Sequence, residues 1–223
     1  MSTTSRSFIN TAWYNFLKVM CRVFFVAVYG VRVAGRENVP LAGGLLICSN
    51  HQSHFDPVLV GLAVDRRMNY LGRKSLFRFL PLRLLIESVG AIPIERDGFG
   101  LAGVKETLRR LKRGEAVLMF PEGTRTLDGE VAPLKPGFAA MARRGRVPLL
   151  PVAVDGAFQA WPRTAPLPRP AIIHVVIGAP ITPEEIERLA DDELMAELQS
   201  RIVDCHRRAA MKSGARGKAA ASS

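Results

Sequence analysis

A histidine and an aspartate five positions apart are the side chains of this sequence best suited to acid–base chemistry. His51 and Asp56 lie in Asn50-His51-Gln52-Ser53-His54-Phe55-Asp56-Pro57, directly after the apolar run 45–48, which predicts a buried strand. An imidazole beside a carboxylate has a fixed tautomer and can take a proton from a hydroxyl group. The pair therefore predicts a general base. The alternative is that Asp56 only caps a helix that begins with Pro57.

A second strand end carries a similar group of polar residues. The apolar run 116–119 is followed by Phe120-Pro121-Glu122-Gly123-Thr124-Arg125, so a carboxylate and an arginine lie in a loop that contains a glycine. Functional residues of α/β proteins are commonly placed in such loops at strand ends. The repeated pattern favours chemistry over helix capping at the first loop.

These two segments and two others resemble the motifs of the glycerolipid acyltransferase family, in its 1-acyl-sn-glycerol-3-phosphate (lysophosphatidic acid) acyltransferase type. The four motifs are, in order, Asn50-His51 with Asp56, Gly90-Ala91-Ile92-Pro93-Ile94-Glu95-Arg96, Phe120 to Arg125, and Val147-Pro148-Leu149-Leu150-Pro151-Val152. Their order and approximate spacing match over about residues 30–180. Thr126 departs mildly from the pattern, because a serine is frequent there.

The resemblance implies acyl transfer from acyl-CoA or acyl carrier protein to the free hydroxyl of 1-acylglycerol-3-phosphate, which gives phosphatidic acid. His51 would take the hydroxyl proton, Asp56 would hold its ring, and backbone amides of the 51–57 turn would stabilise the oxyanion. No covalent intermediate is needed, because the thioester is already activated. The resemblance implies neither a metal nor another cofactor.

The same resemblance assigns five residues to substrate binding. Arg96 and Arg125 would bind the phosphate of the acceptor, since a guanidinium group is a planar donor for phosphate oxygens. Glu122 would bind an acceptor hydroxyl or orient Arg125, because a carboxylate beside a phosphate is otherwise repulsive. Gly123 would let the backbone approach the ligand, and Thr124 completes the loop.

Other functions stay open at this point. The same histidine and aspartate could activate water in a thioester or lipid hydrolase, and the acceptor could be another lyso-lipid, such as a lyso-aminolipid. His51 and His54 form an HxxH pair that could hold zinc, but no further convincing ligand is evident. A basic membrane-binding module without activity is a third alternative, against which the ordered motifs argue.

The charge balance favours an anionic partner. The 223 residues carry a formal net charge of +11, which suits an anionic bilayer or a phosphorylated substrate. Nucleic acid is the weaker candidate, because no nucleic-acid-binding motif is present. Cys21, Cys48 and Cys205 show no metal spacing and predict three reduced thiols. Together with the resemblance, these features indicate a membrane-associated protein at the cytoplasmic face of a bacterial inner membrane.

Residues 8–29 predict an amphipathic helix that lies in the membrane interface. The segment is apolar and aromatic, but Lys18 and Arg22 interrupt it on one helical face, so its uncharged run is too short to span a bilayer. The alternative is a helix packed on the domain core. A second basic amphipathic segment, over 73–84, also suits contact with anionic lipid.

Alternating strand and helix patterns predict an α/β fold. We expect a single domain with a mixed, mostly parallel sheet flanked by helices, as in glycerol-3-phosphate acyltransferases. Strands are expected at 31–34, 44–48, 68–71, 90–94, 116–120, 148–154 and 171–177, and helices at 8–29, 57–64, 76–88, 100–112, 137–144 and 182–210. The expected divisions are an amphipathic helix within 1–29, an acyltransferase domain over 30–210 and a disordered basic tail over 211–223.

Overall fold

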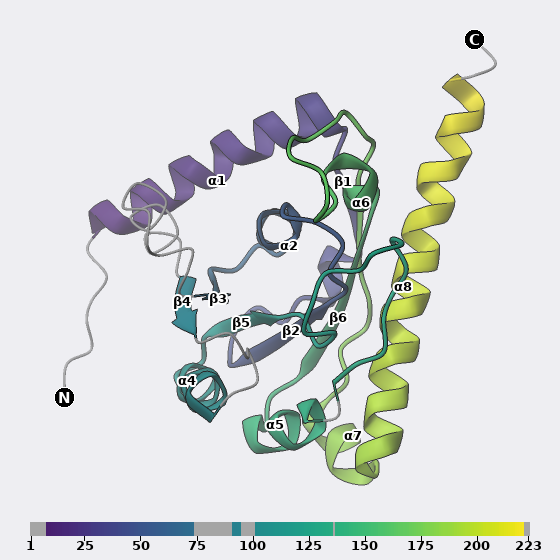
Figure 1. Cartoon of the computed structure of the whole chain (residues 1–223). Helices are drawn as coiled ribbons and strands as arrows, with labels where there is room; N and C mark the ends of the chain where they lie inside the picture. The colour runs from purple at the N-terminus through teal and green to yellow at the C-terminus, as the bar shows by residue number, and fades with distance from the viewer. Residues whose placement is uncertain (1–7, 74–90, 95–100, 136, 221–223) are drawn as a thin grey trace.

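The computed structural model describes residues 8–73, 91–94, 101–135 and 137–220, which form one sheet covered by helices on both faces (Figure 1). Its strands are β1 (Arg32–Ala34), β2 (Leu45–Ser49), β3 (Met68–Arg73), β4 (Ala91–Ile94), β5 (Ala116–Met119), β6 (Leu149–Asp155) and β7 (His174–Ile177). They lie in the order β1-β7-β6-β2-β5-β3-β4. The five strands from β6 to β4 are mutually parallel, whereas β7 is antiparallel to β6, and β1 is parallel to β7. The expected fold class is confirmed.

The central strand β2 shows why the sequence pattern is continuous rather than alternating. Every residue of β2 is buried. Leu45 and Ile47 pack into the core on one face of the sheet, and Leu46 and Cys48 pack into the core on the other. Because successive side chains of a strand point to opposite faces, a strand that is covered on both sides needs apolar residues at every position.

The helices form two layers. One face of the sheet is covered by α1 (Phe8–Tyr29), α2 (Asp56–Ala63) and α6 (Ala157–Ala160). The other is covered by α4 (Leu101–Lys112), α5 (Phe138–Gly145), α7 (Pro183–Arg188) and the long helix α8 (Asp191–Ala220), which runs past β6 and β7 (Figure 1). A short 3-10 helix, η1 (Arg36–Asn38), follows β1. The expected strands and four of the expected helices are confirmed, apart from shifts at their ends, whereas the helix at 76–88 and nearly all of the segment 73–84 lie outside the described residues.

The prediction of one helix over 182–210 was wrong, because the chain forms two. Thr182 begins α7 with a capping box, in which its side chain and that of Glu185 bond each other's backbone N–H groups. Leu189 is extended and ends this helix. The acidic residues at 191–193 then lie in the first turn of α8, where the positive end of the helix dipole favours them.

The basic tail over 211–223 was expected to be disordered, yet α8 continues to Ala220. The hydroxyl of Ser213 donates a hydrogen bond of 2.7 Å to the carboxylate of Asp155, at the end of β6. This bond joins the helix to the sheet beyond residue 210.

Candidate active site

The two polar loops meet because the strands before them are parallel neighbours. Cys48 of β2 pairs with Met119 of β5. His51 and Glu122 each follow their paired residue by three positions, and the backbone N–H of His51 donates to Oε1 of Glu122 at 2.9 Å. The register of the sheet therefore brings the first and third motifs into direct contact.

His51 is fixed on four sides. Its Nδ1 lies 2.7 Å from Oδ2 of Asp56, and its backbone carbonyl accepts a hydrogen bond of 2.8 Å from the N–H of Thr126. Its backbone N–H binds Glu122, and its ring stacks on that of Phe120, with ring centroids 3.9 Å apart. Nε2 has no hydrogen-bond partner among the described residues, and the side chain is 19% exposed. The arrangement thus leaves one basic nitrogen available to a substrate.

Asp56 organises the loop over residues 50–56 instead of capping α2. Its side chain is fully buried, and Oδ2 also accepts the backbone N–H groups of Gln52 at 2.6 Å and Ser53 at 2.7 Å. Phe55 is the N-cap residue of α2, without a side-chain cap, and Pro57 lies in the first turn. The alternative in which Asp56 only caps a helix is therefore not what the structure shows, because its carboxylate turns back to the loop that carries His51.

Glu122 supports the same loop from inside the protein. We expected it to bind an acceptor hydroxyl or to orient Arg125, but its two oxygens accept the backbone N–H groups of His51 and Ala132, the latter at 3.2 Å. The residue is 2% exposed. Burial raises the pKa of Glu122 to about 7, despite the two backbone donors that favour its charged form.

Arg125 lies where the two loops meet. Its Nη1 contacts Nε2 of His54, whose ring packs on Trp161 with centroids 4.7 Å apart. Burial, followed by the nearby Arg125 guanidinium, lowers the pKa of His54, so this imidazole is suited to accept a hydrogen bond. Gly123, with a φ of 74°, and Thr124 are exposed beside Arg125.

The second predicted arginine, Arg96, lies outside the described residues. The strand before it, β4, ends at Ile94 and is parallel to β3, which is parallel to β5. The carboxyl end of β4 therefore lies at the same edge of the sheet as the loops that carry His51 and Glu122.

Three polar residues of the loops have roles that the sequence did not show. The side-chain amide of Asn50 exchanges two hydrogen bonds with the backbone of Val154, at 2.8 and 2.9 Å, and so ties the loop to β6. The Thr126 hydroxyl donates to Asp128 at 2.6 Å and organises the following turn. Gln52 is buried at 1% exposure and reaches backbone groups outside its own loop. A polar residue directly after a buried strand is the signal that could have indicated such bonds.

Cys48 and the HxxH pair of His51 and His54 have surroundings that differ from those of a nucleophile or of a zinc site. Cys48 is fully buried, and burial raises the pKa of its thiol, which opposes the thiolate form that a nucleophile needs. His51 uses Nδ1 for Asp56, and His54 contacts Arg125. Within the described ranges, no three His, Cys, Asp or Glu side chains are grouped so that they could hold a metal ion.

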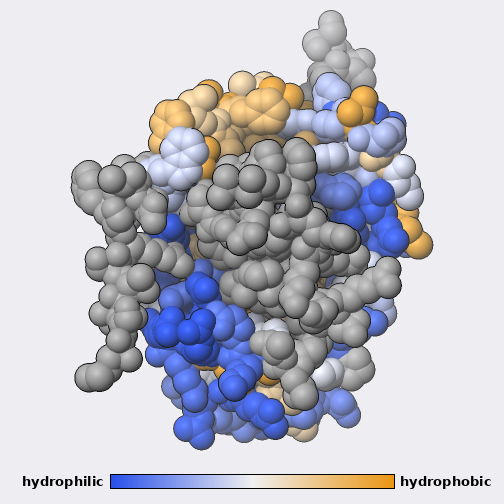
Figure 2. All heavy atoms as spheres, turned by 60° about the vertical axis from the view of Figure 1, so that its left-hand side comes forward, coloured by the Kyte–Doolittle hydropathy of each residue, from blue (hydrophilic) through white to orange (hydrophobic). Residues whose placement is uncertain are grey.

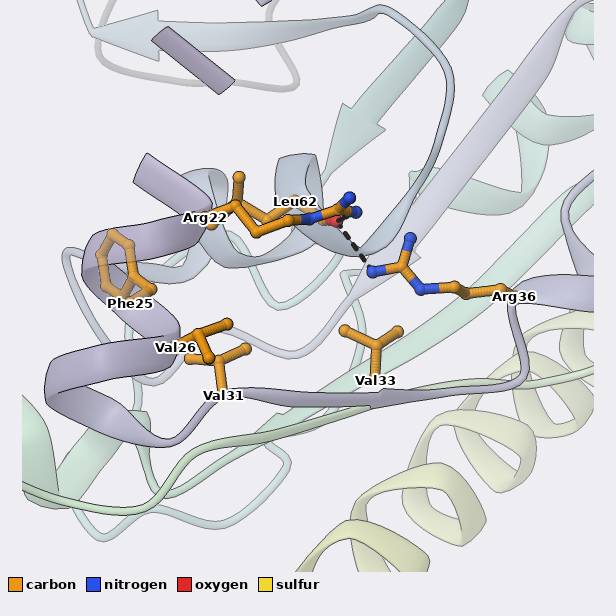
Figure 3. Close-up of a pocket in the computed structure, with 7 residues that line it drawn as sticks. All are labelled: Arg22, Phe25, Val26, Val31, Val33, Arg36 and Leu62. Atoms are coloured by element: carbon orange, nitrogen blue, oxygen red, sulfur yellow. Dashed lines mark hydrogen bonds between the residues drawn. The ribbon is translucent and has the colours of Figure 1, made fainter. Parts of the chain in front are cut away.

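A pocket of about 290 Å³ lies elsewhere, between α1, β1 and α2 (Figure 3). Its lining comprises Arg22, Phe25, Val26, Val31, Val33, Arg36 and Leu62. None of these residues belongs to the loops that carry His51 and Glu122. Both arginines donate to the carbonyl of Leu62 near the end of α2, at 3.1 and 3.2 Å. The pocket therefore lies at the contact where α1 and η1, the turn after β1, bind the end of α2.

Known proteins share this sequence pattern. The Acyltransferase family model matches residues 30–155, which include the loops that carry His51 and Glu122. A 1-acyl-sn-glycerol-3-phosphate acyltransferase of Bacillus subtilis is 28% identical over 186 residues, which cover 83% of this chain and 90% of that protein. Its counterpart in Pseudomonas aeruginosa is 32% identical over 176 residues, covering 77% of this chain and 66% of that protein. The chain covers only 52% of a chloroplast protein of the same name from Brassica napus.

The fold also has a solved relative. The crystal structure of the 1-acyl-sn-glycerophosphate (LPA) acyltransferase PlsC from Thermotoga maritima superposes with a TM-score of 0.79, over 91% of this chain and 81% of that one. The two sequences are 22% identical, so the likeness supports the arrangement of sheet and helices.

The raised pKa of Glu122 predicts a pH-dependent stability. An acid whose pKa is about 7 when folded and near 4.5 when unfolded binds more protons in the folded state between these values, so its ionisation destabilises the protein as pH rises through that window. Relative to Glu122→Gln, the wild type should lose up to roughly 3 kcal/mol of unfolding free energy between pH 5 and 8. Urea denaturation at several pH values measures this difference.

Glu130→Gln is the matched control, because Glu130 is an exposed glutamate of the same loop. Its difference from the wild type should stay constant over the same pH range. A constant difference for Glu122→Gln as well would show that Glu122 is ionised without penalty.

Proposed function

This chain belongs to the acyltransferase family and is an acyltransferase, and we propose that it transfers an acyl group from acyl-CoA or acyl carrier protein to 1-acylglycerol-3-phosphate, giving phosphatidic acid. The observation that carries the proposal is His51, held at Nδ1 by a buried carboxylate and open at Nε2, in a segment that the family model matches. Several relatives bear the name of this activity. The acceptor and the donor carrier are part of the proposal.

In the proposed reaction, Nε2 of His51 takes the proton of the acceptor hydroxyl while the oxygen attacks the thioester carbonyl. Asp56 stabilises the imidazolium that forms. The proton then passes to the thiolate that leaves when the tetrahedral intermediate collapses. A group held in position within hydrogen-bond reach of the hydroxyl contributes about 10²–10⁴-fold to such a rate.

We expected backbone amides of the 51–57 turn to bind the oxyanion, but most of them already have hydrogen-bond partners. The N–H groups of His51, Gln52, Ser53 and Phe55 all donate within the site, to Glu122, Asp56 or the Ser53 hydroxyl. These bonds maintain the loop, and breaking one would cost about as much as it gained. The positive charge beside the loop, on Arg125, is the described group best suited to a developing oxyanion or to the acceptor phosphate.

We assign the phosphate of the acceptor to Arg125, together with Arg96 from the second motif. Arg125 lies between the motif loops, next to the exposed Gly123 and Thr124, so a ligand can approach it from solvent. A guanidinium group offers two parallel donors to a phosphate. Thr124 would add a hydroxyl donor. Glu122 acts indirectly, through the backbone of His51.

We propose further that the outer face of α1 attaches the enzyme to a bilayer. Apolar side chains cover this face and gather along the upper edge of the surface in Figure 2. They are Trp13, Phe16, Val19, Met20, Val23, Phe24, Val26 and Val28, all about half exposed. An exposed apolar stripe of this size on a helix suits the interface of a membrane. No helix of the described chain has the length and hydropathy to cross a bilayer.

The two basic residues of α1 share one face of the helix, and this face is turned toward α2. Lys18 Nζ donates to the carbonyl of Val64 at 3.0 Å, and Arg22 donates to that of Leu62 at 3.1 Å. Both also lie within 4 Å of Asp65. They bind the carboxyl end of α2 beneath the helix, so attachment through α1 should depend on apolar burial more than on charge.

Aromatic contacts connect α1 with the catalytic loop. The ring of Phe25 meets that of Phe55 at 5.0 Å, and Phe55 meets Trp161 at the same distance. Phe55 directly precedes Asp56. The proposed membrane helix is therefore packed against the loop that carries the base, which suits an acceptor that is delivered from the bilayer. The cytoplasmic face of a bacterial inner membrane is the location that we propose.

The first prediction concerns the base. His51→Ala should lower kcat by about 10²–10⁴-fold, because the proton acceptor is lost. The variant also loses the ring contacts with Asp56 and Phe120, so it should be less stable than the wild type but keep its circular dichroism spectrum. Acyl transfer from acyl-CoA and from acyl carrier protein is measured with several lyso-lipids as acceptors. Near-normal turnover by the folded variant would contradict the mechanism, and thioester cleavage that ignores every acceptor would indicate a hydrolase instead.

The second prediction concerns Arg125. Because one charge-assisted hydrogen bond contributes roughly 1.5–3 kcal/mol, Arg125→Ala should lower kcat/KM for 1-acylglycerol-3-phosphate by about one to two decades. The KM of the acyl donor should not change. Arg144→Ala removes an exposed arginine from α5 and is the control. A rise in the donor KM alone would mean that Arg125 serves the donor.

The third prediction concerns the membrane. A double variant, Phe16→Glu with Val23→Glu, should lower binding to phospholipid vesicles more than tenfold, since burial of one large apolar side chain contributes about 1.5–3 kcal/mol. High salt should release little of the wild type, because Lys18 and Arg22 face the protein. Met211→Glu changes an exposed apolar residue of α8 and should bind normally. Vesicle sedimentation tests all three, and full release by salt would refute apolar attachment.

A further inference from the structure

A second group of polar side chains, two buried and two half-buried, lies behind the loop that carries His51. It consists of Gln52 from the loop, Asp155 at the end of β6, and His206 and Ser213 from α8. Gln52 is 1% exposed and His206 is 8% exposed. The two α8 residues lie beyond the part of the chain that the family model matches. None of the four has a part in the proposed proton transfer.

The orientation of the Gln52 amide is set by backbone groups. Its Nε2 donates to the carbonyl of Gly129 at 2.6 Å, and its Oε1 accepts the N–H of Phe158 at 3.3 Å. A rotated amide would place oxygen against oxygen at Gly129, so the alternative orientation is disfavoured. The remaining N–H of Gln52 points at Nε2 of His206, 3.0 Å away.

This geometry assigns the tautomer of His206. Nε2 of His206 lies 3.0 Å from the Gln52 amide nitrogen and 3.4 Å from Oδ1 of Asp155. The amide nitrogen can only donate, so we assign Nε2 as the acceptor in the shorter contact and place the ring proton on Nδ1. The ring itself is placed by α8, which Ser213 ties to Asp155 at 2.7 Å. One imidazole nitrogen of the C-terminal helix thus completes the hydrogen bonding of a buried amide in the catalytic loop.

Gln52 is connected to the base by two short paths. It follows His51 directly in the chain, and its backbone N–H donates to Oδ2 of Asp56, the oxygen that also holds Nδ1 of His51. Any displacement of Gln52 therefore moves the carboxylate that orients the imidazole. A misplacement of about 1 Å in a catalytic group can cost about 10²-fold in rate.

We propose that His206 is a positioning residue for the general base, acting through the side chain of Gln52. The inference rests on the proposed function for its kinetic consequence, but the structural link from His206 to the His51–Asp56 bond stands without it. It makes the C-terminal helix a part of the active site rather than only a cover for the sheet.

The test compares two uncharged substitutions at one position. His206→Leu removes the acceptor, so the N–H of Gln52 loses its partner, and kcat should fall roughly tenfold while both KM values change less than about twofold. His206→Gln places a carbonyl oxygen near the position of Nε2 and should restore most of kcat. Ile202→Val is the control for packing, because Ile202 is a buried residue of α8 one turn earlier that does not belong to the group.

A spectroscopic readout separates this inference from the proposed activity. The Nδ1 proton of His51, bound to Asp56 at 2.7 Å, should give a downfield proton resonance in the wild type that can be followed in each variant. The resonance should shift or broaden in His206→Leu and return in His206→Gln, whichever substrate the enzyme uses. Absence of acyl transfer by the wild type would refute the proposed function and leave this comparison intact.

Three results would overturn the positioning role. They are an unchanged kcat and resonance in His206→Leu, a His206→Gln variant as impaired as His206→Leu, and an equal loss of kcat in Ile202→Val. If His206→Leu does not fold, the double variant Gln52→Met with His206→Leu removes donor and acceptor together. Its effect on kcat should then equal that of Gln52→Met alone, because a shared contact is lost only once. A further loss beyond that of Gln52→Met would count against the role.

Discussion

A single buried oxygen, Oδ2 of Asp56, holds the loop that carries His51 together. It accepts hydrogen bonds from the ring of His51 and from the backbone N–H groups of Gln52 and Ser53. Because the side chain has no exposure to solvent, water cannot replace any of these donors at low cost. The loop therefore closes on itself between the end of β2 and the start of α2, and the ring of His51 has one orientation. The bonds of Asn50 and Gln52 to more distant backbone groups then fix this closed loop to the sheet.

The two acids around His51 differ in what they do with their charge. Asp56 meets the ring directly and can stabilise an imidazolium, whereas Glu122 meets only backbone N–H groups. Burial and then the negative charge of Asp56 raise the pKa of Glu122, which opposes a second full charge in the same small volume. Asp56 is thus placed to stabilise a positive charge on the ring of His51, whereas Glu122 chiefly holds the shape of the loop.

Short-range patterns predicted most of the fold and the centre of the site, whereas long-range contacts decided the rest. The apolar runs before His51 and Glu122 predicted β2 and β5, and the motif spacing predicted that these loops act together. The direction in which Glu122 turns depends on Ala132 and on the register of two strands, which spacing does not contain. Lys18 and Arg22 face inward because they bind carbonyl groups at the end of α2. These partners are 46 and 40 positions away in sequence, so the local pattern of α1 does not show them. The contact between Gln52 and His206 spans 154 positions and has no local signal.

The inward anchors of α1 also restrict how the helix can rotate. Two cations bound to the carboxyl end of α2 prevent the helix from rolling about its own axis, so the same apolar stripe always faces outward. A peripheral protein with such a helix would bind the bilayer at one tilt angle and one depth. The distance between the lipid surface and the imidazole would then be set by the fold rather than by the membrane. That fixed height would select how far an acceptor headgroup must rise from the bilayer before it can react.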